Sequence, residues 1–223
     1  MRKIFQAELH HIGEELVELS VLVHTAMERA SIALQTADLD LAQDVISSDA
    51  RIDFLQNNLD ERAIEVLALQ SPVAGDLRAI VASLRISASL ERMGDLARHI
   101  AQLARLRYPQ HAIPDPLGPT FREFSDVDLA IADKLTRLLS ERDLDLAHDI
   151  IEHNKQVNHL HAGVFAALAA PDWDAPATQS VDVALASRYF ERFADHGVSV
   201  AQKVNYLVTG EWQAGAASTL QAS

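Results

Sequence analysis

The 223-residue sequence contains no cysteine, eight glycines, seven prolines and few aromatic residues. Without cysteine, the chain has no disulfide, no thiolate metal ligand and no cysteine nucleophile. Basic residues are also scarce, because 19 lysines and arginines face 32 aspartates and glutamates, which gives a formal net charge of −13. Direct binding to nucleic acid or to an anionic membrane surface requires a basic footprint. We therefore expect neither.

Long apolar runs are missing as well. No stretch approaches the roughly 18 uninterrupted apolar residues that a membrane-spanning helix needs. The opening segment, MRKIFQAELHHIGEELVELS, has glutamates where a signal peptide has its apolar region. We expect a cytoplasmic protein that reaches the inner face of the membrane only through partner proteins.

Apolar residues recur at steps of three or four along most of the chain, which is typical of amphipathic helices. The pattern predicts three long helices in the first half, over about 5–34, 41–66 and 73–107. Asp38 is a plausible N-cap of the second helix. Three more helices are predicted in the second half, over about 120–140, 144–168 and from the break at PDWDAPAT to about 208. Nothing in the sequence predicts a strand.

The two halves repeat each other. ADLDLAQDVISSDARIDFL, 37–55, matches RDLDLAHDIIEHNKQVNHL, 142–160, at eight of 19 positions, and Glu-Arg-x-x-Asp occurs at 91–95 and again at 191–195. Such self-similarity indicates two copies of one unit. We predict an all-α fold of two tandem three-helix bundles, packed side by side or end to end. The repeats would span 1–108 and 120–212, with a proline-rich linker over 109–119 and a frayed tail over 213–223.

Repeated acidic pairs are the main candidates for function. Glu91 and Asp95 lie about 40° apart on one helix face, and Asp49 and Asp53 form a second pair with the same spacing. Glu191 and Asp195 repeat the first pair. Like charges at this spacing repel each other, so something must offset them. Arg92 and Arg192 are adjacent in sequence but are expected to project elsewhere.

A bound cation is one way to offset this repulsion. Carboxylates from two facing helices give the layout of a bundle metal site, and oxygen ligands suit magnesium, manganese, calcium, iron or zinc. The alternative is purely structural: solvated acidic faces, or salt bridges to arginine or lysine on a neighbouring helix. His99 continues the face of Glu91 and Asp95, but its counterpart in the repeat is Ser199, which favours a surface position or one behind the ligands.

Taken together, these segments resemble the PhoU family of bacterial phosphate-uptake regulators. The resemblance covers about residues 3–212. It rests on the opening helix FQAELHHIGEELVEL, on DLDLAQDVISSDARIDFL, on SPVAGDLRAIVASLRISASLERMGDLA and on RYFERFADHGVSVAQKVNYLVTGE. It implies two three-helix bundles, homodimerisation and metal clusters on the acidic motifs.

The resemblance also implies a regulatory role. PhoU-like proteins link the ATPase subunit of the phosphate ABC transporter to a phosphate-sensing histidine kinase, and they act as negative regulators of phosphate uptake and of the phosphate-starvation response. By the same resemblance, a first metal site would use Asp49, Asp53, Glu91 and Asp95, with Asp76 nearby. A second would use Glu191 and Asp195.

The sequence departs from this pattern in the second repeat. Asn154 and Asn158 stand where the first repeat has Asp49 and Asp53. Asparagine brings no charge to a cation, so we expect the first site to bind metal better than the second, unless Glu152 compensates.

Two other functions remain open: an enzyme that uses the carboxylates to hold metal for hydrolytic or redox chemistry, and a structural or metal-buffering bundle. No nucleophile–base arrangement is legible, so we do not expect an enzyme. Nor do we expect free phosphate to bind, because the sequence has no Arg/Lys cluster with a glycine-rich loop.

Overall fold

The computed structural model describes residues 2–70, 72 and 75–211. Over these residues the chain forms six α-helices and one short 3₁₀ turn, with no strand. The α-helices are α1 (Arg2–Thr36), α2 (Leu39–Gln70), α3 (Gly75–Arg107), α4 (Gly118–Glu141), α5 (Leu144–Leu168) and α6 (Ala177–Thr209), and the 3₁₀ turn is η1 (Asp115–Leu117). None of these helices is long and apolar enough to cross a membrane.

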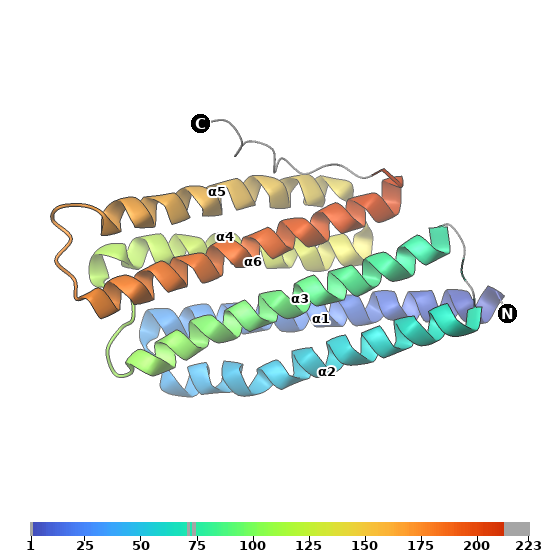
Figure 1. Ribbon diagram of the computed structural model, residues 1–223, viewed down its shortest axis with the longest axis horizontal. Coiled ribbons are helices and arrows are strands. Elements are labelled where there is room, and N and C mark those ends of the chain that lie inside the picture. Colours follow the sequence, from blue (N-terminus) through green and yellow to red (C-terminus); the bar gives the residue numbers. More distant parts are fainter. Residues whose placement is uncertain (1, 71, 73–74, 212–223) are drawn as a thin grey trace.

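The helices form two three-helix bundles that lie side by side (Figure 1). Helices α1, α2 and α3 make the first bundle, and α4, α5 and α6 make the second. The inner helices join the bundles: α3 packs along α6 on one face, and α1 packs along α4 behind them. Both of these pairs run antiparallel (Figure 1). The all-α double bundle that the repeat predicts is therefore confirmed, and of the two arrangements left open, the side-by-side one is found.

The repeated segments fold into equivalent turns. After α1 the chain passes through Ala37 with a φ of 52°, and after α4 it passes through Arg142 with a φ of 57°. An aspartate follows each and caps the next helix: Asp38 Oδ1 accepts from Leu41 N at 2.9 Å, and Asp143 Oδ1 accepts from Asp145 N at 3.0 Å. The predicted N-cap at Asp38 is confirmed. Residues of α1 and α2 thus correspond to those 105 positions later in α4 and α5.

The connection between the bundles is packed onto the core. Ala112, Ile113 and Leu117 are buried, and α4 begins at Gly118, slightly before the predicted start, because Pro119 suits the first turn of a helix. Val73, where the sequence pattern would begin the third helix, and the predicted frayed tail over 213–223 lie outside the described residues.

Apolar side chains from all six helices form one continuous core. Large members such as Phe121, Phe124 and Phe190 stack on one another inside the second bundle, with ring centroids 5.4–6.0 Å apart. The seam between α1 and α4 also carries polar contacts: Ser20 Oγ donates to Thr136 Oγ1 and Gln35 Nε2 donates to Ser125 Oγ, both at 3.0 Å. These bonds satisfy polar groups that the packing of the two bundles shields from water.

Candidate functional site

The first acidic cluster lies where α2 and α3 approach each other closely. Gly94 allows this approach, because a Cβ atom there would lie 2.9 Å from Ile52 Cδ1. Asp49 is almost fully buried beside this contact, whereas Asp53, one turn further along α2, is exposed. Glu91 and Asp95 of α3 are partly buried. The structure thus brings the two predicted acidic pairs to one interhelical face.

An arginine lies between these carboxylates. Arg98 Nε is 2.5 Å from Asp49 Oδ2, and its Nη2 donates a short hydrogen bond to Asp95 Oδ1. Arg92, expected to project elsewhere, instead places Nη1 2.9 Å from Asp95 Oδ2 and Nε 3.5 Å from Glu91 Oε2. The expectation for Arg92 was wrong, because a long arginine side chain can reach a carboxylate three residues further along the same helix.

The electrostatics of the cluster reflect this arrangement. Burial raises the pKa of Asp49, and the charges of Asp53 and Asp95 add to that effect, while Arg98 opposes it. Burial and the charge of Asp95 likewise raise the pKa of Glu91. Burial also disfavours the ionised form of Asp95, but the hydrogen bonds and charges of Arg98 and Arg92 outweigh it and lower its pKa.

The second cluster has a different composition. Glu191 is buried on α6 and accepts from Arg188 Nη1 at 2.6 Å. Asp195 is exposed and accepts from Asn154 Nδ2 of α5 at 3.3 Å. Burial and the charge of Asp195 raise the pKa of Glu191. Asn158 is exposed.

Other polar residues near Glu191 and Asp195 complicate the second cluster. Glu152, considered as a compensating ligand, is exposed and pairs with Lys155 at 2.6 Å. The side-chain oxygen of Asn154 is buried without a hydrogen-bond partner. The cluster therefore holds an unsatisfied acceptor that the first cluster does not have at the equivalent position.

Two side chains that matter here were missed in the sequence. Arg98 is three residues after Asp95, a spacing that signals an ion pair on a helix. Asp128 lies in the apolar stripe of α4, fully buried, and neither carboxyl oxygen has a hydrogen-bond partner. Burial raises the pKa of Asp128 well above its usual value, and the nearby charge of Asp195 adds to the shift. Asp128 could have been found in the sequence, because it is a carboxylate at a position where the helical pattern expects an apolar residue.

His99 does not lie on the open surface. Its ring is half-buried, with its centroid 5.2 Å from that of Tyr189 on α6, and its Nδ1 has no hydrogen-bond partner. Burial, followed by the charge of Arg98, lowers the pKa of His99. It packs in the seam between the bundles, behind the first acidic cluster.

Within the described part of the chain, no three histidine, aspartate or glutamate side chains are spaced to hold a metal ion as they stand. The oxygen donors of the first cluster match a hard divalent cation in kind, but Arg98 occupies the place between Asp49 and Asp95. The second cluster offers fewer charges. The structure is a duplicated helical bundle that carries two clusters of charged side chains at equivalent positions of its two halves.

Comparison with known proteins gives the family. The family model described as "PhoU domain" matches residues 16–104 and again 121–204, one stretch in each bundle. The chain belongs to the PhoU family.

Individual relatives span nearly the whole chain. It is 41% identical over 210 residues to "Phosphate-specific transport system accessory protein PhoU homolog 2" of Mycobacterium tuberculosis, which covers 94% of this chain and 99% of that protein. It is 39% identical to PhoU homolog 1 of Mycobacterium leprae, covering 95% and 96% respectively. The crystal structure of PhoU from Pseudomonas aeruginosa superposes with a TM-score of 0.84 at 28% identity, covering 93% of this chain and 100% of that one. PhoU from Streptococcus pneumoniae, at 22% identity and a TM-score of 0.84, shares the fold.

Proposed function

We propose that this chain is an accessory protein of a phosphate-specific transport system. The observation that carries the proposal is the match, at 41% identity over 94% of the chain, to a protein that bears this name. On this proposal it works in the cytoplasm as an adaptor between the transporter's ATPase subunit and a phosphate-sensing histidine kinase, and it restrains phosphate uptake and the starvation response. Relatives named as accessory proteins fit a role without catalysis.

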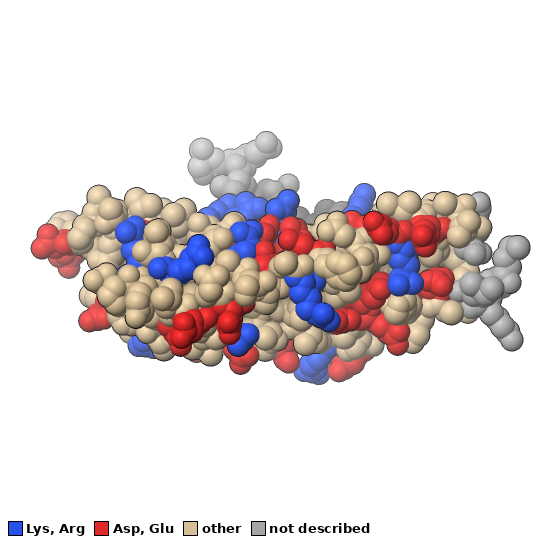
Figure 2. Space-filling model, turned by 90° about the horizontal axis from the view of Figure 1, so that it is seen from below, with Lys and Arg blue, Asp and Glu red and all other residues tan. Residues whose placement is uncertain are grey.

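Surface charge supports an adaptor that meets basic patches on its partners. Viewed from below, on the side where α2 lies, acidic side chains run along the molecule with basic ones between them (Figure 2). Exposed carboxylates of α2 contribute to this charge, among them Asp40, Asp44, Glu61 and Glu65. With a net charge of −13, attraction to a basic partner surface would speed association and weaken at high salt.

The adaptor role can be tested by recovery from membranes. Tagged chain is incubated with membranes of its own organism that contain the transporter, and the ATPase subunit and the kinase are detected in the eluate. We expect both to be recovered, and recovery to fall when Glu61 and Glu65 are changed to Lys. A phosphate-starvation reporter should become active when the gene is deleted. Failure to recover either partner, together with an unchanged reporter, would contradict the proposal.

We infer further that the first acidic cluster binds a metal ion in competition with Arg98. Four carboxylates lie on this interhelical face, Arg98 bridges two of them, and burial raises the pKa of Asp49 and Glu91. Iron, zinc, manganese and magnesium all accept such oxygen ligands. A metal would replace the positive charge that Arg98 supplies, and Arg98 would have to swing out toward solvent.

Elemental analysis of protein purified without chelator tests the metal proposal. The wild type is compared with the double variant Glu91→Ala/Asp95→Ala and with the matched double variant Glu191→Ala/Asp195→Ala. We expect the first pair of substitutions to abolish most bound metal and the second pair to remove less. A wild type that stays free of metal after reconstitution would eliminate the metal site while leaving the adaptor role to be judged on its own test.

The homodimer implied by the resemblance also remains a prediction. Light scattering on the eluting peak of a size-exclusion column distinguishes a 24.5 kDa monomer from its dimer. We expect the dimer.

A further inference from the structure

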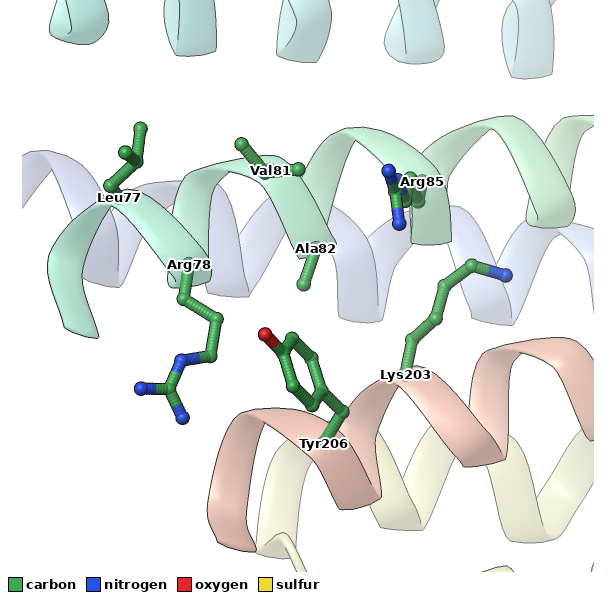
Figure 3. A pocket seen from close by; sticks show the side chains of 7 residues that line it. All are labelled: Leu77, Arg78, Val81, Ala82, Arg85, Lys203 and Tyr206. Carbon is green, nitrogen blue, oxygen red and sulfur yellow. The ribbon is translucent and has the colours of Figure 1, made fainter. Parts of the chain in front are cut away.

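A cavity of about 440 Å³ opens between the first turns of α3 and the last turns of α6 (Figure 3). Helix α3 contributes Leu77, Arg78, Val81, Ala82 and Arg85, and α6 contributes Lys203 and Tyr206. Its volume falls within the range of small-molecule sites. It lies in the seam between the bundles, away from the acidic clusters near the middle of the same helices.

The charges in this cavity are all positive. Arg78, Arg85 and Lys203 form no ion pair with any carboxylate of the described residues, although acidic residues outnumber basic ones by 32 to 19 in the chain. Lys203 Nζ donates only to neutral oxygens, to Ser89 Oγ at 3.3 Å and to the backbone and side chain of Ser199. Its pKa is lowered by burial and by the charge of Arg85. Two cations thus lie near each other without a counter-ion.

The opposite end of the seam provides an internal comparison. Positions of α3 and α6 correspond at a spacing of 100 residues, as the two Glu-Arg-x-x-Asp motifs show, so Ala82 corresponds to Asp182. Asp182 is buried and accepts from Arg107 at Nε and Nη2, at 2.5 and 2.9 Å. That end of the seam carries its own counter-ion. At the cavity, Ala82 and Leu207 stand where that end has Asp182 and Arg107, so the wall supplies no carboxylate to Arg85 and Lys203.

The walls restrict the kind of anion. Leu77 and Val81 are 42% and 37% exposed, which leaves apolar surface uncovered beside the charges. Arg78 lies over the ring of Tyr206, 5.3 Å from its centroid, so this cation is held at the rim by a cation–π contact. In Figure 3 Lys203 and Arg85 both lie on the far side of Tyr206 from Arg78. A free inorganic anion would fill only a small part of this space.

We propose that the cavity binds a small organic phosphate, with the phosphoryl group at Arg85 and Lys203 and an apolar or aromatic body against Leu77 and Val81. A phosphoryl dianion matches two adjacent cations better than a single carboxylate does. The site depends neither on the transport role nor on metal at the acidic clusters.

Isothermal titration in phosphate-free buffer tests the proposal, with adenosine monophosphate, adenosine and inorganic phosphate as probes. We expect saturable binding of the nucleotide, binding of inorganic phosphate at least about tenfold weaker, and no heat from adenosine. Arg85→Ala, at an exposed position, should weaken nucleotide binding about tenfold or more, because it removes a charge-assisted hydrogen bond. Ala82→Asp supplies the counter-ion found at the other end of the seam and should weaken it equally.

Arg105→Ala is the matched control. It removes one exposed arginine from the same helix, 20 residues away, where Arg105 donates only to Gln43. Nucleotide affinity should stay as in the wild type, and circular dichroism and thermal unfolding check the fold of all three variants. The proposal fails if no probe binds, if Arg85→Ala and Ala82→Asp bind as the wild type does, or if Arg105→Ala loses as much. Equal affinity for inorganic phosphate and nucleotide would contradict the proposal that the ligand's organic body contacts the cavity. Sedimentation with phosphatidylglycerol vesicles, lost in Arg85→Ala while no nucleotide binds, would make the surface a membrane contact instead.

Discussion

The two acidic clusters occupy equivalent places in the two bundles but stabilise their charges in different ways. In the first, Asp49 and Asp95 share Arg98, so charge is met with charge across an interhelical contact. In the second, the residue equivalent to Arg98 is Val198, and Asn154 donates a hydrogen bond to Asp195 instead. The repeated helices have kept their packing, while the charges inside them have been rearranged.

On the inner helices α1 and α4 the difference runs the other way, because there the second bundle has a charged residue where the first has an apolar one. Asp128 of α4 corresponds to Val23 of α1, and both are buried. The second bundle therefore loses two carboxylates on α5 and gains one in its core. The comparison teaches that a duplicated fold tolerates charge in different places provided that each group is paired, neutralised or exposed. Exchanging residues between equivalent positions tests this directly.

The largest effect is expected from Arg98→Val, which gives the first cluster the residue of the second. With the bridge removed, Asp49 and Asp95 lose their shared partner while partly shielded from water. We expect the free energy of unfolding to fall by about 3 kcal/mol in the presence of chelator. Urea unfolding measures it, and added divalent metal should restore part of the loss. Arg92→Ala, at a side chain that is 63% exposed, is the control and should change stability by less than about 1 kcal/mol.

Asp128→Val makes the opposite exchange and should stabilise the protein by about 2 kcal/mol, because it removes a buried carboxyl group without hydrogen bonds. The pKa of Asp128 is raised in the folded state, so the folded chain binds more protons than the unfolded chain does. In the wild type, this group therefore favours folding below the unfolded pKa of about 4, and that contribution is lost as pH rises toward the folded pKa. Denaturation followed from pH 4 to 8 should show a smaller decline in the variant. A destabilised variant would mean that Asp128 has a partner in solution.

The next largest effect is expected when the aspartates of α2 and the equivalent asparagines of α5 are exchanged. Asp49→Asn/Asp53→Asn should reduce metal affinity at the first cluster by about tenfold or more, because it removes two anionic ligands. Asn154→Asp/Asn158→Asp should raise the affinity of the second cluster. Metal titration followed by elemental analysis measures both. Unchanged metal content in both double variants would exclude the acidic positions on α2 and α5 as ligands.

The smallest effect concerns two glycines of the second bundle. A Cβ atom at Gly163 would meet nothing within 4 Å, and Gly163 lies exposed inside α5. We expect Gly163→Ala to raise the free energy of unfolding by about 0.5–1 kcal/mol, since alanine is the better helix former. At Gly197 a Cβ atom would lie 2.7 Å from Ile131 Cγ2, so Gly197→Ala should lower it. Thermal or urea unfolding of both variants measures these changes. It shows whether helix propensity governs stability at Gly163 and close packing governs it at Gly197.

Much of the fold follows from the sequence, because strong three-and-four periodicity fixes helices, and aspartates and prolines mark their ends. The predicted α5 agrees with the structure at both ends, Leu144 and Leu168. The choice between side-by-side and end-to-end bundles could not be made, since the apolar stripes of α3 and α6 face both their own bundle and the other. Only the three-dimensional packing shows that α3 and α6 each pack against their own bundle and against the other bundle.

The candidate sites were less predictable because charges act across space. The acidic pairs on α2 and α3 do gather as expected, but Arg98 and Arg92 turn toward them, and rotamers of such long side chains are not encoded in spacing alone. Arg85 and Lys203, which meet at the cavity, are more than 100 positions apart in the sequence, so no local cluster of basic residues predicts the site. Asp128 was legible in principle as a polar interruption of the stripe that contains Phe124 and Ile131.

The seam between the bundles has a consequence for cooperativity. Helices α1, α3, α4 and α6 each pack against both bundles, so neither half has a complete apolar boundary of its own. Separation of the halves would expose the buried seam, including the inner faces of α3 and α6, and that cost couples their unfolding. We therefore expect the two bundles to unfold in one transition, with a calorimetric enthalpy equal to the van't Hoff enthalpy. Duplication would then have made a single thermodynamic unit, in which a destabilising substitution in one bundle lowers the stability of both.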